Sequence, residues 1–365
     1  MGLTPSYLSG VSENLQEIYS QLEISIMQDL ARRISKANYL MASAQWQTYK
    51  LEQIGMSQKY IAEQIAKITG KSQKEVLQMF KDAGIKTCKQ DTTLQNEMIK
   101  KGLLPKDAIP LTAAESFTQV LNVNLLKTNN SLKNMTGTIA QDASGQLNKY
   151  MDQCQLLIQS GGFSQDQAIN LSVDRFARDG VATFNYASGI RTPIESAVRR
   201  AAVTGVNQAA AQISENNADA LGTNLVEVTR HSDARPEHAV WQGKVYMLVG
   251  SNDKYANLAE ATGYGTVTGL CGANCRHSFY PFVEGISDKL PKEKYDETTY
   301  QNEQMQRYNE RMIRSWKKRQ ATLEAGGVDS SATKSKVAEW QKKQRTFLKG
   351  TGLTRQYQRE RIAKK

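Results

Sequence analysis

Long apolar segments are missing from this sequence, and their absence excludes one class of proteins. No run approaches the roughly 18 continuous apolar residues from which a membrane-spanning helix is recognised. The first residues, MGLTPSYLSGVSENL, have neither the basic region nor the apolar region of a secretion signal. We therefore expect a soluble protein that has no membrane span and is not secreted.

Cysteine is also scarce, with four residues in a chain of 365. This number is too small for a scaffold held together by disulfides, and it indicates synthesis in a reducing compartment. Hydrophobic residues make up 39% of the chain, which is low for a compact enzyme. A Gly-rich phosphate loop, a nucleophile elbow and a paired-carboxylate motif are all missing. We expect an extended, helix-rich protein that is not an enzyme.

Basic residues outnumber acidic residues in one part of the chain alone. Residues 1–288 contain 27 lysines and arginines and 27 aspartates and glutamates, whereas residues 289–365 contain 20 and 9. The formal net charge of +11 therefore resides entirely in the last 77 residues. Charge that is segregated in this way is typical of a tail or face that binds a polyanion.

The first half of the sequence carries helical signals. Apolar residues recur at helical spacing over 11–80, with an interruption near Gly55. Capping signals predict a separate short helix over 71–84, which Gly84 would close in a left-handed conformation. Similar start signals and a Gly-Gly break predict further helices over 113–127, 136–159 and 165–179.

A mixed module should follow. Thr192 and Pro193 combine an N-cap hydroxyl with a proline at the first helical position, so a helix should run from there to about Ile213. Its alanine-rich sequence leaves one face small enough for close packing. After Gly222 the pattern becomes that of a small α+β module. Strands are expected over 225–230, 244–249 and 279–283, with a short helix over 254–261.

The C-terminal part returns to helical spacing after Pro291. A narrow apolar stripe lies on a basic helix that should end at Gly326. Residues 335–365 have helical propensity but few apolar anchors, so we expect them to be disordered unless a partner orders them.

The predicted fold class is mainly α with a small α+β module. The expected divisions are an elongated helical N-terminal region over 1–190, the α+β module over 191–288, and a basic helical or partly disordered C-terminal tail over 289–365.

All three histidines and two of the four cysteines lie in one window of fewer than fifty residues. Imidazole and thiolate groups are the ligands that zinc prefers, although Cys-x-x-x-Cys departs from the commoner spacing of two residues. Two other interpretations stay open: a disulfide between the two cysteines, and buried thiols with hydrogen-bonded imidazoles that shape a loop. The candidate zinc ligands are His231, His238, Cys271, Cys275 and His277.

An enzyme is the alternative built on the same window. Asp233, His238 and His277 could form a metal-dependent nuclease or a general acid/base centre, with Arg235 or Arg276 holding a phosphate. However, a proline follows Arg235, and this pair is typical of a turn in which the guanidinium contacts Asp233 or a backbone carbonyl. We favour the structural interpretation.

Two stretches of this window resemble the signature of the phage minor capsid protein 2 family, which is itself similar to the Mu F-like minor head proteins of tailed bacteriophages. The first is HSDARPEHAVWQGKVY, beginning at His231, and the second is GLCGANCRHSFYP, beginning at Gly269. The wider group has an Arg-Pro-x-His-x-x-x-x-Gly segment and a later Asn-Cys-Arg segment, and both occur here in that order. The signature positions are His231, Asp233, Arg235, Pro236, His238, Trp241, Gly243, Cys271, Asn274, Cys275, Arg276 and His277.

This resemblance implies a structural protein of the virion. It implies a minor capsid protein at the portal vertex that supports head assembly, genome packaging or DNA delivery, with the portal protein and the capsid as partners. It implies no established catalytic residue or cofactor. Such a protein would be made in the cytoplasm of the bacterial host. A DNA-binding effector injected with the genome is a second alternative.

Packaged double-stranded DNA is the polyanion that the basic tail would meet. No base-reading motif is evident, so binding should be independent of sequence. The predicted DNA contacts are Lys317, Lys318, Arg319, Lys342, Lys343, Arg345, Arg359, Arg361, Lys364 and Lys365.

Overall fold

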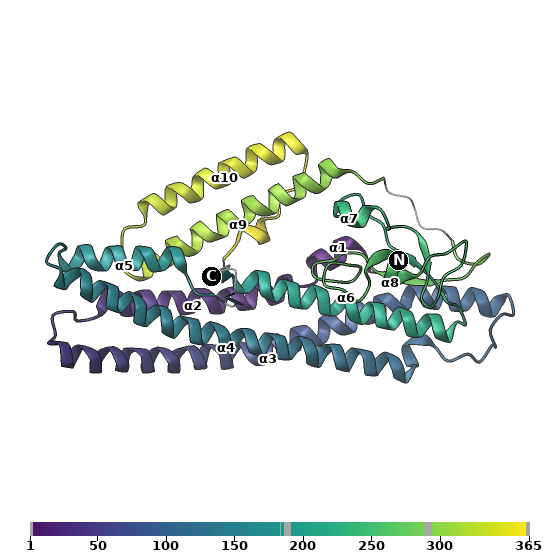
Figure 1. The fold of residues 1–365 in the computed structure, drawn as a ribbon, viewed down its shortest axis with the longest axis horizontal. Helices are drawn as coiled ribbons and strands as arrows, with labels where there is room; N and C mark the ends of the chain where they lie inside the picture. The colour runs from purple at the N-terminus through teal and green to yellow at the C-terminus, as the bar shows by residue number, and fades with distance from the viewer. Residues whose placement is uncertain (1–2, 183, 186–190, 289–293, 363–365) are drawn as a thin grey trace. The chain divides into compact units, whose positions relative to one another are not determined.

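Helices dominate the computed structural model of the chain (Figure 1). The structure describes residues 3–182, 184–185, 191–288 and 294–362. The chain also forms a three-stranded antiparallel sheet. The predicted fold class, mainly α with a small α+β module, is confirmed. Among the described residues, none of the helices combines the length and the apolar composition needed to span a bilayer.

The N-terminal helices are longer and fewer than the sequence signals predict. The separate helix over 71–84 is wrong, because one helix continues through Gly55, Gly70 and Gly84. An interior glycine costs a helix only about 1 kcal/mol relative to alanine, and packing along the rest of the helix outweighs that cost. The elements are α1 (Pro5–Gly10), α2 (Glu13–Lys36), α3 (Ser43–Lys100), η1 (Leu111–Ala113), α4 (Glu115–Gln159) and α5 (Gln165–Asp179).

Gly84 serves packing and does not end a helix. A Cβ atom added there would lie 3.0 Å from the Phe117 ring of α4, closer than side chains normally approach. The predicted break between residues 127 and 136 is also wrong, since α4 is continuous there. The predicted start of α5 is confirmed, because the Ser164 hydroxyl and the Gln167 side chain form a reciprocal capping box.

Helix α6 (Ile194–Ala220) begins directly after Pro193, as predicted, but continues seven residues beyond Ile213. Its small face allows close packing. A Cβ atom added at Gly205 would lie 2.4 Å from the hydroxyl of Thr128 in α4 and 3.2 Å from the Phe80 ring in α3. Glycine is therefore required where these three helices meet.

The module that follows α6 contains the sheet. Its strands are β3 (Leu225–Val228), β4 (Val245–Met247) and β5 (Phe279–Phe282), in the order β4-β3-β5, with Val226 paired to both Tyr246 and Pro281. Two short helices, α7 (Pro236–Ala239) and α8 (Leu258–Thr262), lie between the strands in sequence. All three predicted strands are confirmed, although they are shorter than expected. A further two-residue pair joins β1 (Phe184–Asn185) to β2 (Arg191–Thr192).

The C-terminal part is helical and packed. Helices α9 (Glu297–Ala325) and α10 (Ser331–Thr351) run side by side and are followed by η2 (Tyr357–Glu360) (Figure 1). The prediction of a disordered segment from residue 335 is wrong for α10. Few apolar side chains hold α10 against α9, but a buried hydrogen bond joins the two helices. Nδ2 of Asn309 donates to Oε1 of Gln344 over 2.9 Å in the interior.

Two compact units share the chain, and each is assembled from three stretches. The first contains the sheet, with a core that includes Val226, Trp241 and Phe279. The second contains the packed α9 and α10. The boundaries predicted near residues 190 and 288 stay a prediction. The first unit comprises Met1–Leu15, Gln73–Leu132 and Val198–Gln301, and the second comprises Gln16–Ser72, Lys133–Ala197 and Asn302–Lys365.

Candidate functional site

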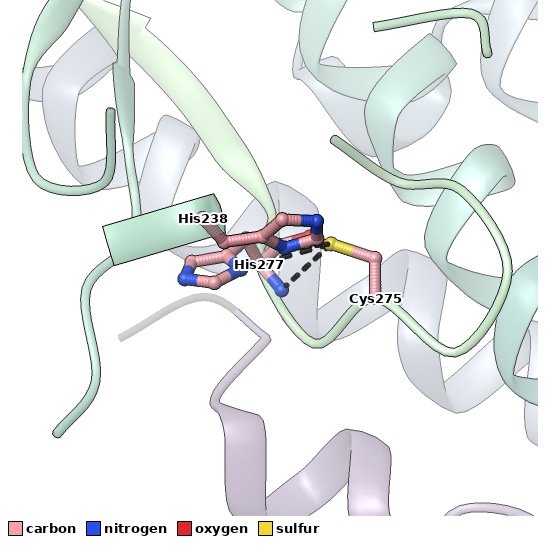
Figure 2. A group of neighbouring side chains, drawn as sticks. All are labelled: His238, Cys275 and His277. Carbon is pink, nitrogen blue, oxygen red and sulfur yellow. Dashed lines mark hydrogen bonds between the residues drawn. The ribbon is translucent and has the colours of Figure 1, made fainter. Parts of the chain in front are cut away.

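Three side chains from separate parts of the signature window meet in the first unit (Figure 2). His238 comes from α7, whereas Cys275 and His277 come from the segment that leads into β5. Nδ1 of His238, Sγ of Cys275 and Nδ1 of His277 lie within 4.8 Å of one another. All three side chains are at most 2% exposed. The site is thus a buried cluster of one sulfur and two nitrogens.

The far nitrogen of each imidazole is held by an oxygen. Nε2 of His238 lies 2.9 Å from the backbone oxygen of Thr268, which can only accept a hydrogen bond. Nε2 of His277 lies 3.0 Å from Oε1 of Gln242, which also accepts from the backbone N–H of His231 over 3.0 Å. Both Nε2 atoms therefore carry the proton, and both Nδ1 atoms present a lone pair.

Aromatic rings surround the cluster and exclude water. The His231 ring stacks on His277 with centroids 4.2 Å apart, and the Trp241 ring contacts His277 and His238 at 4.8 and 4.6 Å. Burial is the main reason that the pKa of His277 is held well below its usual range, and it also lowers the pKa of His238. Burial raises the pKa of the Cys275 thiol. The imidazoles are accordingly neutral, which is the form that binds metals.

Asp233 organises the charged side of the window. One carboxylate oxygen lies 2.7 Å from Nδ1 of His231, and Arg276 forms an ion pair with the other. Arg276 also donates to the backbone oxygen of Asp233 over 3.1 Å. Arg235 donates to the backbone oxygen of Ala273 over 2.9 Å, which confirms the predicted contact with a carbonyl. Both arginines, which a nuclease would use to hold phosphate, already have partners within the protein.

The loop between the two cysteines has an unusual backbone. Cys271 and Asn274 both have a φ of 57°, in the left-handed region that few side chains adopt. Between them, a Cβ atom on Gly272 would lie 2.5 Å from the backbone oxygen of Val267. Arg199 of α6 donates to the side-chain oxygen of Asn274 over 3.3 Å. The loop is thus shaped by residues that lie far from it in sequence.

The structure separates the five predicted zinc ligands into two groups. The ligand atoms of His238, Cys275 and His277 lie close together. His231 instead contacts Asp233, and Cys271 does not belong to the group of three. Both cysteines are free thiols in this structure, and burial raises the pKa of Cys271 well above its usual value.

The remaining signature residues support the backbone around the cluster. Pro236 occupies the first turn of α7, where its missing N–H is harmless. Gly243 has a φ of 66° and donates to the backbone oxygen of Val228 over 3.1 Å. Trp241 is 6% exposed and belongs to the core.

Sequence reasoning missed the three supporting residues Asn207, Gln242 and Thr268. Asn207 of α6 is fully buried and donates to the backbone oxygens of Cys275 and His277 over 3.2 and 2.8 Å. Its only sequence signal is an amide within an alanine-rich stretch, where the neighbouring Gln208 carries a second amide. Thr268 acts through its backbone, which leaves no signal in a sequence.

Three of the predicted DNA contacts have partners within the second unit, and their role in DNA binding stays a prediction. The Lys318 ammonium is buried and lies 2.6 Å from the carboxylates of both Glu23 and Glu195. Arg319 forms an ion pair with Asp174 at 2.7 Å, and Lys317 donates to a backbone oxygen in η2 over 2.8 Å.

The other predicted DNA contacts differ in accessibility. Lys342, Lys343, Arg345 and Arg361 are exposed, whereas Arg359 is half-buried. Lys364 and Lys365 lie outside the described residues.

Comparisons with known proteins agree with the signature. A structural protein of Lactococcus phage LL-H is 28% identical over 334 residues, covering 87% of this chain and 88% of the relative. A structural protein of Lactococcus phage mv4 is 39% identical over 118 residues, covering 31% of this chain and 95% of the relative. No solved structure matches the chain. The sequence pattern of the family described as phage minor capsid protein 2 matches residues 3–349, and the chain therefore belongs to this family of phage structural proteins.

Proposed function

We propose that this phage structural protein is a minor head component at the portal vertex, where it contacts packaged double-stranded DNA through α10. The observation that carries the proposal is the charge of this helix. Six of its 21 residues are lysine or arginine, and one is acidic. In its role the protein supports head assembly, genome packaging or DNA delivery, with the portal protein and the capsid as partners. It is made in the host cytoplasm and resides in the virion.

The basic residues of α10 form a usable surface. Lys342, Arg345 and Lys349 are exposed and recur at spacings of three and four, so they share one face of the helix. Lys343 is also exposed, and its ammonium lies 4.4 Å from the centroid of the Trp340 ring. Lysine and arginine bind phosphates without reading bases, so sequence-independent affinity is expected.

DNA binding should be measured with the full chain and a double-stranded DNA of arbitrary sequence. If about 6 to 10 phosphates are contacted, the affinity should fall by about 10³ to 10⁵ between 50 and 200 mM salt. The triple variant Lys342→Ala/Arg345→Ala/Lys349→Ala should reduce the slope of log affinity against log salt by about 3. The matched control replaces three exposed lysines of α3 with alanine: Lys59, Lys67 and Lys71.

The outcomes separate the proposal from its alternatives. Equal losses in the two triple variants would mean that net charge alone binds DNA, with no role for α10. Cleavage of plasmid DNA in the presence of divalent metal, abolished by His238→Ala, would favour a nuclease. Cross-linking of purified virions should join this chain to the portal protein, and its absence from virions contradicts the proposed location. Its delivery into the infected cell with the genome would favour the injected effector.

A further inference from the structure

The sulfur of Cys275 faces two lone pairs at once. Sγ lies 3.8 Å from Nδ1 of His238 and 3.7 Å from Nδ1 of His277 (Figure 2). A thiol has one hydrogen, so it can donate to one of these nitrogens and not to both. Sγ also accepts from the backbone N–H of His277 over 3.4 Å. Without a further group, one imidazole lone pair is left buried and without a donor.

Neither imidazole can remove this conflict by moving its proton. If His238 carried its proton on Nδ1, the Nε2 lone pair would face the backbone oxygen of Thr268. If His277 did so, its Nε2 lone pair would face Oε1 of Gln242. Turning the Gln242 amide would not help, because its NH₂ group would then face the N–H of His231. The hydrogen bonds of the two Nε2 atoms thus fix the orientation of both rings. Histidine ligands in metal sites are oriented by oxygen acceptors in the same way.

We propose that His238, Cys275 and His277 bind a structural zinc ion through Nδ1, Sγ and Nδ1. In a tetrahedral site with Zn–S of about 2.3 Å and Zn–N of about 2.0 to 2.1 Å, sulfur and nitrogen are separated by about 3.5 to 3.6 Å. The two observed separations, 3.8 and 3.7 Å, exceed this value only slightly. The two imidazole nitrogens lie within 4.8 Å of each other and would be about 3.3 Å apart in such a site, so one ion fits among the three atoms once the two rings close on it.

The donor set selects the metal. One thiolate with two neutral imidazoles suits zinc and does not suit magnesium or calcium, which prefer oxygen ligands. The ligands are at most 2% exposed, which favours a role in folding over catalysis at an open position. The ion would join α7 to the segment before β5, two parts of the chain that are 37 residues apart.

Cys271 is the candidate for the fourth position. Its Sγ lies 3.6 Å from the backbone oxygen of His277, and the same oxygen lies 3.8 Å from Sγ of Cys275. Both sulfurs thus approach the same carbonyl oxygen, although Cys271 lies outside the group of three. A water molecule is the other source of a fourth ligand. Cobalt substitution distinguishes the two, because each thiolate adds to the sulfur-to-cobalt charge-transfer absorption.

The test uses the full chain purified under reducing conditions without chelator. Elemental analysis should find about one zinc per chain, and Cys275→Ala and His238→Ala should each lose it. Cys154→Ala is the matched control, because this buried cysteine of α4 lies outside the cluster and its variant should keep the zinc. The cobalt-loaded wild type should show a thiolate charge-transfer band that Cys275→Ala lacks. Loss of part of this band in Cys271→Ala would identify a second thiolate ligand.

A second arm avoids variants that fail to fold. Removing metal from the wild type with a chelator should lower its melting temperature, and adding zinc alone should restore it. Zinc well below one per chain in a folded wild type that zinc does not stabilise would overturn the proposal. A zinc content unchanged in Cys275→Ala would also overturn it. DNA binding through α10 does not enter these measurements, so the two proposals fail independently.

Discussion

The side-chain amide of Asn207 lies 2.8 Å from the backbone oxygen of His277. The same Nδ2 atom donates to the backbone oxygen of Cys275 over 3.2 Å, and Asn207 is fully buried within α6. One amide thus donates to two backbone oxygens of the loop that precedes β5. Helix α6 fixes the backbone from which the sulfur and one imidazole of the candidate site extend.

Replacing Asn207 should therefore destabilise the loop. In Asn207→Ala, the backbone oxygens of Cys275 and His277 lose their amide donor while they remain buried, at a cost of about 2 to 4 kcal/mol in the free energy of unfolding. Urea denaturation measures this loss. Asn216→Ala is the control in the same helix, because Asn216 is half-buried, and a change of less than about 0.5 kcal/mol is expected there. Equal effects of the two variants would contradict the role assigned to Asn207.

Lys318 should stabilise the fold. Burial raises the pKa of Glu195, but the opposite effect of Lys318 and Arg314 is larger and brings this pKa down to about 2. Lys318→Ala would leave the carboxylates of Glu23 and Glu195 buried with a single cation, at a cost of about 3 to 5 kcal/mol in the free energy of unfolding. The matched control is Lys336→Ala, whose exposed ion pair with Glu339 is worth about 0 to 1 kcal/mol.

DNA binding by folded Lys318→Ala provides a second measurement. Because the ammonium is buried, the salt dependence of binding should match that of the wild type. A variant that keeps its stability but loses affinity for DNA would show that Lys318 is a DNA contact, as the sequence predicted.

Local signals predicted those parts of the fold that local contacts decide. The capping box at Ser164 and the start of α6 after Pro193 depend on residues within one helical turn, and both are confirmed. The continuity of α3 depends on packing, since Gly84 accommodates Phe117, which lies 33 residues further along the chain. A glycine in a sequence does not show whether it ends a helix or admits a neighbour.

The candidate site was predictable to a similar degree. Histidine and cysteine are scarce in this chain, so the one window that contains all three histidines and two cysteines stood out as the candidate site. Sequence could not show that His231 turns toward Asp233 while His238 and His277 turn toward Cys275, since backbone oxygens and Gln242 set these orientations. In the tail, charge counting could not show that Lys318 pairs with a carboxylate inside the protein, because its partner Glu23 lies 295 residues away.

A pair of glycine variants should distinguish a helix break from a packing contact in α3. Gly70 is exposed and has nothing within 4 Å of an added Cβ atom, so Gly70→Ala should raise the free energy of unfolding by about 1 kcal/mol. Gly84→Ala should lower it, because the new methyl group would crowd Phe117 and overpacking costs about 1 to 3 kcal/mol. Thermal denaturation of both variants measures the signs. Destabilisation by Gly70→Ala would indicate that the helix is interrupted there.

The buried carboxyl group of Asp91 should make stability depend on pH. Burial is the largest cause of its raised pKa, which is about 7, although Nδ2 of Asn217 donates to it over 2.7 Å. Because the unfolded pKa is about 3.9, the folded state binds the extra proton, and the contribution of Asp91 to the free energy of unfolding should fall by about 4 kcal/mol as pH rises from about 4 through 7. Cys88 titrates outside this window, since burial raises its pKa to about 11. Asp91→Asn removes the effect, so its advantage over the wild type in urea denaturation should grow from near zero at about pH 4 to several kcal/mol at about pH 8. Asp107→Asn, at an exposed position, should follow the wild-type curve, and a curve for Asp91→Asn parallel to the wild type would refute the assignment.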